Sequence, residues 1–237
     1  DEVSKCKDWS RYKYSPDYFN SCDISFGVST PINFSGYQIP KSGNAYVGVA
    51  TYITRTQFPN FREYIGAKLT STLVIGQKYF FSMRCVGTKS SMGPSNCYSD
   101  KLGVNFSKVA YSALNPYPIK NSAKVSATAI INDTVNWTMV KGSFVSDSSY
   151  QYIILGNFYD DNFTDTLIFD GNTNCLGAYY FIDDVCLSTD SSFTYNYIPT
   201  KNFFYLKDTY KINIYPNPVE DILYVKKIIK KEYYNII

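Results

Sequence analysis

One stretch near the end of the chain constrains the fold most: Gly177-Ala-Tyr-Tyr-Phe-Ile-Asp-Asp-Val-Cys-Leu187. Its aromatic and β-branched residues, followed by a Ser/Thr/Asp cluster, are typical of a β-strand. Strict alternation would place Asp183 on one face and Asp184 on the other, each among large apolar side chains. A buried carboxylate needs a partner, which is a set of backbone N–H groups, a basic side chain or a metal ion. We therefore predict that this strand closes a β-sandwich and that Asp183 or Asp184 ties down a neighbouring loop.

The composition favours a β-domain and excludes histidine chemistry. The chain has 237 residues, of which 18% are aromatic and none is histidine, so Ser-His-Asp catalysis and His-ligated zinc are ruled out. Of the formal net charge of +3, residues 210–237 carry +2 and the body carries +1, which gives no electrostatic case for nucleic acid. No apolar run is long enough to span a bilayer. No signal peptide is visible, and we expect a mature or trimmed product.

Strand patterns follow one another through the body, and no convincing helix interrupts them. About eight or nine strands favour an all-β fold, a β-sandwich of the jelly-roll type. We expect loops over residues 1–22 and 31–44, and a hairpin turn over Ser146–Ser149. The expected domains are a jelly roll over 1–187, a linker over 188–209 and a partial β module over 210–237. The expected strands are Ala45–Thr54, Phe61–Leu69, Lys78–Val86, Leu102–Phe106, Lys124–Ile131, Trp137–Val145, Tyr150–Phe158 and Gly177–Leu187.

The cysteines indicate disulfides and an oxidising compartment, because six are present without any Cys-x-x-Cys pair. A bridge between Cys6 and Cys22 would close a loop of about 15 residues and stabilise the fold by roughly 3 kcal/mol. A bridge between Cys85 and Cys97 would staple the base of a Gly/Ser-rich loop.

The last two cysteines, Cys175 and Cys186, are harder to pair. Eleven residues of extended strand reach roughly 35 Å, far beyond disulfide distance. They can therefore bond only if the strand starts late or bends. Otherwise Cys186 reaches the N-terminal region.

A first candidate ligand site is Arg62-Glu63-Tyr64, with Arg62 and Tyr64 on one face of a strand. A sugar site needs planar bidentate donors and acceptors beside an aromatic face, and these residue types supply them. The alternative is an ion pair inside the fold, in which Arg62 binds Glu63 of a neighbour or an aspartate in a loop.

A second candidate site is Asp17 and Tyr18, which with Phe19 could line a groove beside Trp9. The alternative is a turn that its own aromatic side chains hold in place.

A structural Ca²⁺ is a further possibility at Asp183 and Asp184, because calcium takes carboxylate and carbonyl oxygens. The acidic loop around Asp160 and Asp161 offers further oxygens without the spacing of an EF-hand. The alternative is a structural carboxylate that is satisfied by hydrogen bonds.

The C-terminal segment Tyr215-Pro-Asn-Pro-Val-Glu-Asp-Ile-Leu-Tyr-Val225 resembles the opening of the type A sorting domain of the type IX secretion system, found in Bacteroidetes. Only the first strand or two of that domain are present, so the tail resembles a truncated copy. The resemblance implies export by the type IX secretion machinery to the medium or to the outer-membrane surface. The residues that carry it are Tyr215, Pro216, Asn217, Pro218, Asp221 and Leu223.

Residues 6–187 resemble a jelly-roll, galactose-binding-like module of the kind found in carbohydrate-binding modules of such secreted proteins. That resemblance implies a glycan ligand and no catalysis, and related modules often hold a Ca²⁺ at the aspartate of the closing strand. The matching pieces are Ser15-Pro-Asp-Tyr-Phe-Asn-Ser-Cys22, Pro31-x-Asn-Phe-Ser-Gly36, Ser42-Gly-x-Ala-Tyr-Val-Gly48, Arg62-Glu-Tyr-Ile65, Trp137, Ile154-Leu-Gly-Asn-Phe158 and Tyr179-Tyr-Phe-Ile-Asp-Asp-Val-Cys186.

Three functions follow from these observations. The first is a secreted or cell-surface, non-catalytic binding module for carbohydrate. The second is a structural or adhesive surface protein. The third is a polysaccharide-degrading enzyme without histidine, which would use two carboxylates.

Overall fold

The computed structural model describes residues 6, 8–23, 27–54, 59–89, 95–110, 119–169 and 171–196, together with three short strands beyond residue 211. The elements are β1 (Trp9–Lys13), β2 (Asp17–Asn20), β3 (Ile32–Asn33), β4 (Gly36–Tyr37), β5 (Ala45–Ile53), β6 (Tyr64–Lys68), β7 (Lys78–Gly87), β8 (Cys97–Ser99), β9 (Leu102–Ser107), β10 (Val125–Ser126), β11 (Thr138–Val145), β12 (Tyr152–Asn157), the 3-10 turn η2 (Asp161–Phe163), β13 (Thr166–Ile168), β14 (Gly177–Ser188), α1 (Ser191–Tyr195), β15 (Ile212–Ile214), β16 (Val225–Lys227) and β17 (Tyr234–Asn235).

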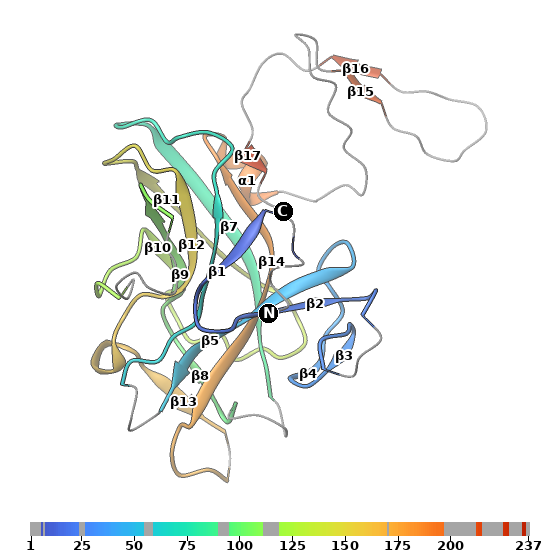
Figure 1. Ribbon diagram of the computed structural model, residues 1–237, viewed down its shortest axis with the longest axis vertical. Helices are drawn as coiled ribbons and strands as arrows, with labels where there is room; N and C mark the ends of the chain where they lie inside the picture. The colour runs from blue at the N-terminus through green and yellow to red at the C-terminus, as the bar shows by residue number, and fades with distance from the viewer. Residues whose placement is uncertain are drawn as a thin grey trace, which may run out of the picture.

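Two antiparallel sheets form the body (Figure 1). Sheet A has the order β1-β6-β12-β9-β10, and sheet B has the order β11-β7-β14-β5-β2. The chain crosses between the sheets repeatedly, since β5, β7, β11 and β14 belong to sheet B while β6, β9, β10 and β12 belong to sheet A. This crossing is the jelly-roll arrangement that the strand patterns predict, and the all-β prediction is confirmed.

The main core lies between the inner faces of the two sheets. Sheet A contributes Trp9, Ile65 and Leu155, and sheet B contributes Phe81, Met83 and other buried side chains of β7 and β14. A second apolar cluster around Phe19, Tyr46 and Phe181 covers part of the outer face of sheet B. Burial on both faces is why sheet B is rich in aromatic residues rather than alternating apolar with polar ones.

The closing strand, β14, lies in the middle of sheet B between β7 and β5 (Figure 1). Tyr180 and Ile182 face the main core, as alternation predicts, but beyond the two aspartates it is Val185 and Leu187 that do so. The strict alternation expected across the whole strand is therefore wrong. The reason is a β-bulge between Asp183 and Cys186, where Asp184 takes a left-handed φ of 49° and the extra residue exchanges the two faces.

The aspartates of β14 anchor the loop that precedes β5. One carboxylate oxygen of Asp183 accepts hydrogen bonds from the backbone N–H groups of Lys41 (2.8 Å) and Ser42 (3.3 Å). Its other oxygen accepts from the N–H of Asp184 at 2.8 Å, and the hydroxyl of Ser42 donates to Asp184. The prediction that these acids tie down a neighbouring loop is confirmed.

Three expectations about the strands are corrected. Residues 1–22 are not only loop, because Trp9–Lys13 pairs with β6 and Asp17–Asn20 pairs with β5. Of the strand expected over Lys124–Ile131, only Val125–Ser126 pairs. Ser146–Ser149 is not a hairpin turn, because β11 and β12, which it joins, lie in different sheets.

The segment expected to be a linker after residue 187 begins with the helix α1. The side chain of Asp190 caps it by accepting from the N–H groups of Ser192 and Phe193, and Ser82 of β7 donates to the carbonyl of Thr194. Within the described residues, no helix is long and apolar enough to cross a membrane.

Further along, β15 pairs with β16, and β17 pairs with the end of β14. The boundaries at 187 and 210 remain predictions, and the sorting-signal residues Tyr215–Leu223 lie outside the described residues.

One disulfide is present among the described cysteines, and it joins Cys97 of β8 to Cys175 just before β14, with a Cα–Cα distance of 5.3 Å. The side chain of Asn96 brings the two segments together by donating to the carbonyl of Asn174 and accepting from the N–H of Leu176. The predicted pair Cys85–Cys97 is therefore wrong, and Cys175 does not bond to Cys186, a pairing that the sequence leaves open. The predicted Cys6–Cys22 bridge is not formed either, since Cys6, Cys22, Cys85 and Cys186 are free thiols.

The disulfide generates the first prediction. Replacing both partners (Cys97→Ser with Cys175→Ser) opens a closure that spans 78 residues of sequence, which should lower the free energy of unfolding by about 4 kcal/mol. Urea unfolding monitored by tryptophan fluorescence measures this change. Cys22→Ser, at an exposed free thiol, is the control and should stay within about 0.5 kcal/mol of the parent. Equal stability of the double variant and the parent would contradict the assignment.

Candidate functional site

Arg62 belongs to the interior of the protein, with 0% of its side chain exposed. Its Nη2 donates to Asp161 at 2.8 Å and to the hydroxyl of Thr164 at 3.3 Å, while its Nη1 donates to the carbonyl of Phe61. The guanidinium also lies over the ring of Tyr52, 4.9 Å from its centroid. The interpretation as an ion pair with a loop aspartate is confirmed. The predicted ligand contact of Arg62 is wrong, because solvent does not reach its side chain.

Glu63 and Tyr64 are buried beside Arg62. Glu63, 6% exposed, accepts from the N–H of Ala50 at 2.9 Å and from the hydroxyl of Ser15 at 3.2 Å. Burial raises the pKa of its carboxyl to about 7, the nearby charge of Asp17 adds to this, and the hydrogen bonds oppose it. Tyr64 has no exposed surface and donates to the carbonyl of Asn157. Both residues are structural, so the predicted ligand role is wrong for them too.

The groove expected between Asp17, Tyr18 and Trp9 stays a prediction. Asp17 and Tyr18 lie on β2 at the edge of sheet B, whereas Trp9 lies on β1 of sheet A and is 6% exposed in the main core. Asp17 accepts from the hydroxyl of Tyr179 at 2.6 Å. The segment is an edge strand rather than the turn of the alternative interpretation, and the structure brings Asp17 next to Glu63 instead.

A calcium ion at Asp183 and Asp184 stays a prediction, and the hydrogen bonds favour the alternative of a structural carboxylate. One oxygen of Asp183 accepts from the backbone N–H groups of Lys41 and Ser42, and the other accepts from that of Asp184. Burial, and then the charge of Asp184, raise the pKa of Asp183 to about 7 against these hydrogen bonds. Among the described residues, no three acidic or cysteine side chains gather where they could hold a metal ion.

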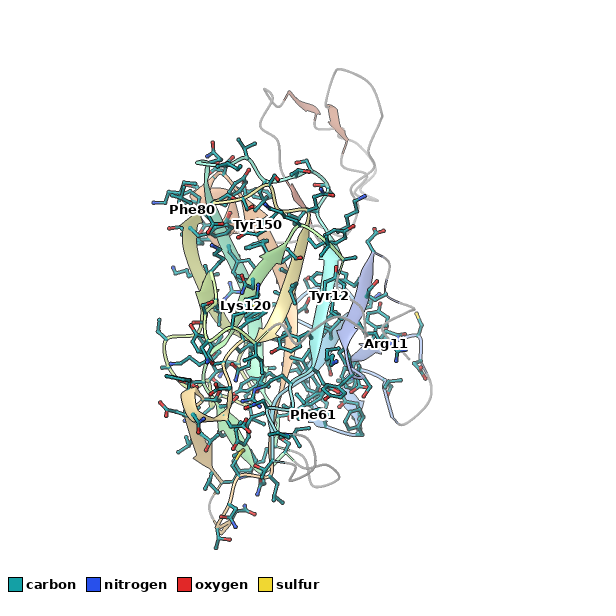
Figure 2. The ribbon with its side chains drawn as sticks, turned by 60° about the vertical axis from the view of Figure 1, so that its left-hand side comes forward. Arg11, Tyr12, Phe61, Phe80, Lys120 and Tyr150 are labelled. Carbon is teal, nitrogen blue, oxygen red and sulfur yellow. A yellow bond between two sulfur atoms is a disulfide. The ribbon has the colours of Figure 1, made fainter. Side chains whose placement is uncertain are left out.

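A depression on the outer side of sheet A is the strongest candidate for a ligand site. It has a volume of about 440 Å³. On β9, Val104 and Phe106 enter the core while Asn105 and Ser107 alternate with them. We call it the basic depression, and it is lined by Asn105, Phe106, Ser107, Lys108, Lys120, Ser122, Ala123, Lys124, Ser148 and Tyr150. Figure 2 shows Lys120 and Tyr150 on the side of the molecule that turns toward the viewer.

One wall of the basic depression is fixed by Asp147. Its two oxygens bind the ammonium of Lys124 and the hydroxyl of Tyr150, each at 2.6 Å, and the ammonium lies over the Tyr150 ring at 5.7 Å. The hydrogen bond from Lys124, followed by the one from Tyr150, lowers the pKa of Asp147. Burial, and then the hydrogen bond to Asp147, raise the pKa of Tyr150 to about 12, so the phenol stays neutral. Across the depression, the amide of Asn105 donates to the carbonyl of Ser122 at 3.2 Å.

No strand or helix pattern in the sequence reveals this site, because its lysines follow neither period. A signal was nevertheless present: residues 101–132 contain four lysines and no acidic residue, in a chain with 23 basic and 20 acidic residues. Such a segregation of charge indicates a cationic surface once the segment is placed on one face.

Comparisons with known proteins add little to this geometry. No protein-family model matches the chain, and no curated protein gives a significant match. Among solved structures, a xylan-binding domain from Paenibacillus barcinonensis is 11% identical, with a TM-score of 0.39, over 77% of this chain and 85% of that one. Two modules of a Clostridium thermocellum xylanase complexed with xylohexaose are 11% identical, with a TM-score of 0.40, over 82% of this chain and 28% of that one. An adhesin domain of Lys-gingipain from Porphyromonas gingivalis is 14% identical, with a TM-score of 0.36, over 78% of this chain and 92% of that one. At these scores the likenesses carry no argument about the ligand.

The buried ion pair generates a prediction about stability. Asp161→Ala leaves the buried guanidinium of Arg62 without its acid, which should lower the free energy of unfolding by about 3 kcal/mol. Asp165→Ala is the matched control in the same loop, because Asp165 is exposed and should shift stability by less than about 0.5 kcal/mol. Chemical denaturation compares the two variants, and equal effects would contradict the role given to the pair.

The raised pKa of Glu63 generates a prediction about pH. Because the folded state holds the proton more tightly than the unfolded state, the free energy of unfolding should decrease as pH rises from about 4.5 to about 7, and the proton's contribution is lost above that range. Glu63→Gln removes this titration. In this variant the slope of the free energy of unfolding against pH should become shallower by up to about 1.4 kcal/mol per pH unit. Urea unfolding across this range, with Asp165→Ala as the control, measures the slope, and an unchanged slope in Glu63→Gln contradicts the prediction.

Proposed function

We propose that this chain is a non-catalytic carbohydrate-binding module that holds its ligand in the basic depression. The observation that carries the proposal is the combination there of an aromatic ring, Tyr150, with the polar side chains of Asn105, Ser122 and Ser148. A saccharide ring has one apolar face and a rim of hydroxyl groups. It therefore needs an apolar surface beside hydrogen-bonding groups that fix its orientation.

The preorganisation of the basic depression supports the proposal. Asn105 and Ser107 lie on β9 in the interior of sheet A, between β12 and β10. Asp147 holds Lys124 and Tyr150 in place, as described above. Side chains that are already ordered lose little conformational entropy when a ligand binds, so a polar site of this kind retains more of its interaction energy.

The chemistry of the lining residues supports binding rather than hydrolysis. A glycosidase needs two carboxyl groups that flank the bond to be cleaved. The described residues that line the depression include no aspartate or glutamate. The carboxylates of Glu63, which is buried, and Asp183, which is partly buried, are occupied by hydrogen bonds within the fold.

A secreted or cell-surface location forms part of the proposal. The disulfide between Cys97 and Cys175 supports an oxidising compartment. The likeness of residues 215–225 to the opening of a type A sorting domain supports carriage by the type IX secretion machinery of a Bacteroidetes cell, although these residues lie outside the described part of the chain.

A structural or adhesive role is the second candidate function. Four exposed apolar side chains favour it: Ile32, Tyr37, Ile39 and Val135. Hydrogen bonds hold their segments together, since Gln38 donates to the carbonyl of Val135 and the indole of Trp137 donates to the carbonyl of Ile39. Exposed apolar patches of this kind mark protein contacts more often than sugar contacts.

A glycan array followed by calorimetry on the full chain tests the first candidate. Tyr150→Ala should weaken saccharide binding about tenfold, because the ring supplies the apolar surface. Tyr37→Ala is the matched control, since Tyr37 is an exposed tyrosine of the apolar patch outside the depression, and it should leave binding unchanged. Thermal unfolding of both variants checks that the fold is retained. Loss of binding in Tyr37→Ala alone, or no binding to any glycan, would overturn the proposal.

A further inference from the structure

We propose that the saccharide recognised in the basic depression is acidic, and that its anionic groups are bound by Lys108 and Lys120. The inference rests on the proposed function and specifies the class of glycan. The anionic group is a carboxylate, as in a uronic acid, or a sulfate ester. Both offer several oxygens to a lysine ammonium, which is a point charge with three donors.

The positive charge at the basic depression is only partly neutralised. Three lysines line the basic depression, and one of them, Lys124, is neutralised by Asp147. Within the described part of the chain, Lys108 and Lys120 are exposed and form no ion pair, which leaves about two positive charges at the rim. Asp160 hydrogen-bonds to Asn121, the residue after Lys120, but both of its carboxylate oxygens are engaged by the fold, one by the amide of Asn121 and one by the backbone N–H of Asn162.

The surrounding sequence maintains this imbalance. The segment 101–132 has no acidic residue, and its fourth lysine, Lys101, pairs with Asp100 at 2.9 Å. The charges of Lys101 and Lys124 are thus compensated by aspartates, whereas those of Lys108 and Lys120 at the depression are not. Uncompensated lysines around a concavity raise the local concentration of anions and orient them on approach.

The extent of the site favours a saccharide over a nucleic acid. The two free lysines border a depression in which Tyr150 is the more accessible of two aromatic rings, since Phe106 is only 6% exposed. The body outside residues 210–237 carries a net charge of only +1. A nucleic-acid surface would present a row of basic residues that follows a phosphate backbone, with several stacking rings. A uronate or sulfated sugar needs one or two cationic contacts beside one ring.

The test is a glycan array in which each neutral oligosaccharide stands beside its uronic-acid counterpart and its sulfated counterpart, probed with the full chain. Calorimetry then measures the affinity for the neutral and the acidic members of the tightest-binding set at about 50 mM and about 500 mM NaCl. Higher salt should weaken binding of the acidic members, because screening weakens contacts between exposed charges. Lys108→Gln and Lys120→Gln should each weaken binding of the acidic member about tenfold and leave any binding of the neutral member unchanged. Lys89→Gln, an exposed lysine beside Phe169 and outside the depression, is the matched control and should change neither.

The outcomes separate the inference from the function on which it rests. Binding of acidic members that falls about tenfold at the higher salt and in both lysine variants supports the inference. Comparison of the uronic-acid oligosaccharides with the sulfated oligosaccharides identifies which anion is recognised. Equal binding of neutral and acidic members, or weaker binding of the acidic member by Lys89→Gln, overturns the inference while the proposed function stands. Tighter binding of single-stranded DNA than of any acidic glycan also overturns it. Silence across the whole array overturns the proposed function and the inference together.

Discussion

The carboxylate of Asp183 is the interaction on which the architecture of sheet B depends. It lies in a strand whose neighbours on both sides are strands of the same sheet, and burial opposes its charge. Three backbone N–H groups offset that cost, two of them from the loop before β5 and one from Asp184. The same site holds the bulge that exchanges the faces of β14. Thus one carboxylate positions the loop beside the bulge that sets which side chains of the closing strand enter the core.

Polar residues in this molecule fall into two groups with different roles. Arg62 and Glu63 are buried and Asp183 is partly buried. Each is bound by partners from distant parts of the sequence, so they determine how loops and strands meet. Lys108 and Lys120 are exposed and not engaged by the described part of the fold. The residue types that make Arg62-Glu63-Tyr64 look like a sugar site are also those that a fold uses for internal recognition. Burial decides between the two roles.

The sequence predicts the closing strand, most of the long strands and the anchoring aspartates, because these depend on local composition and on the cost of burying a charge. It fails for β1 and β2, which are four or five residues long and lie at sheet edges, where little periodicity is expressed. It also fails for the disulfide, since Cys97 and Cys175 are 78 residues apart and meet only through the pairing of β8 with β13 and the contacts of Asn96. The basic depression was missed because its residues come from three segments with no shared pattern.

Amide hydrogen exchange at Lys41 and Ser42, measured by NMR in the parent chain and in Asp183→Ala, tests whether the Asp183 carboxylate holds the loop before β5. Both amides should exchange at least about tenfold more slowly than in an unstructured peptide, and Asp183→Ala should abolish this protection. Asp184→Asn, which suits the left-handed backbone and leaves the Asp183 carboxylate in place, should retain it. Exchange at the unstructured rate in the parent chain, or protection that survives in Asp183→Ala, would contradict the account.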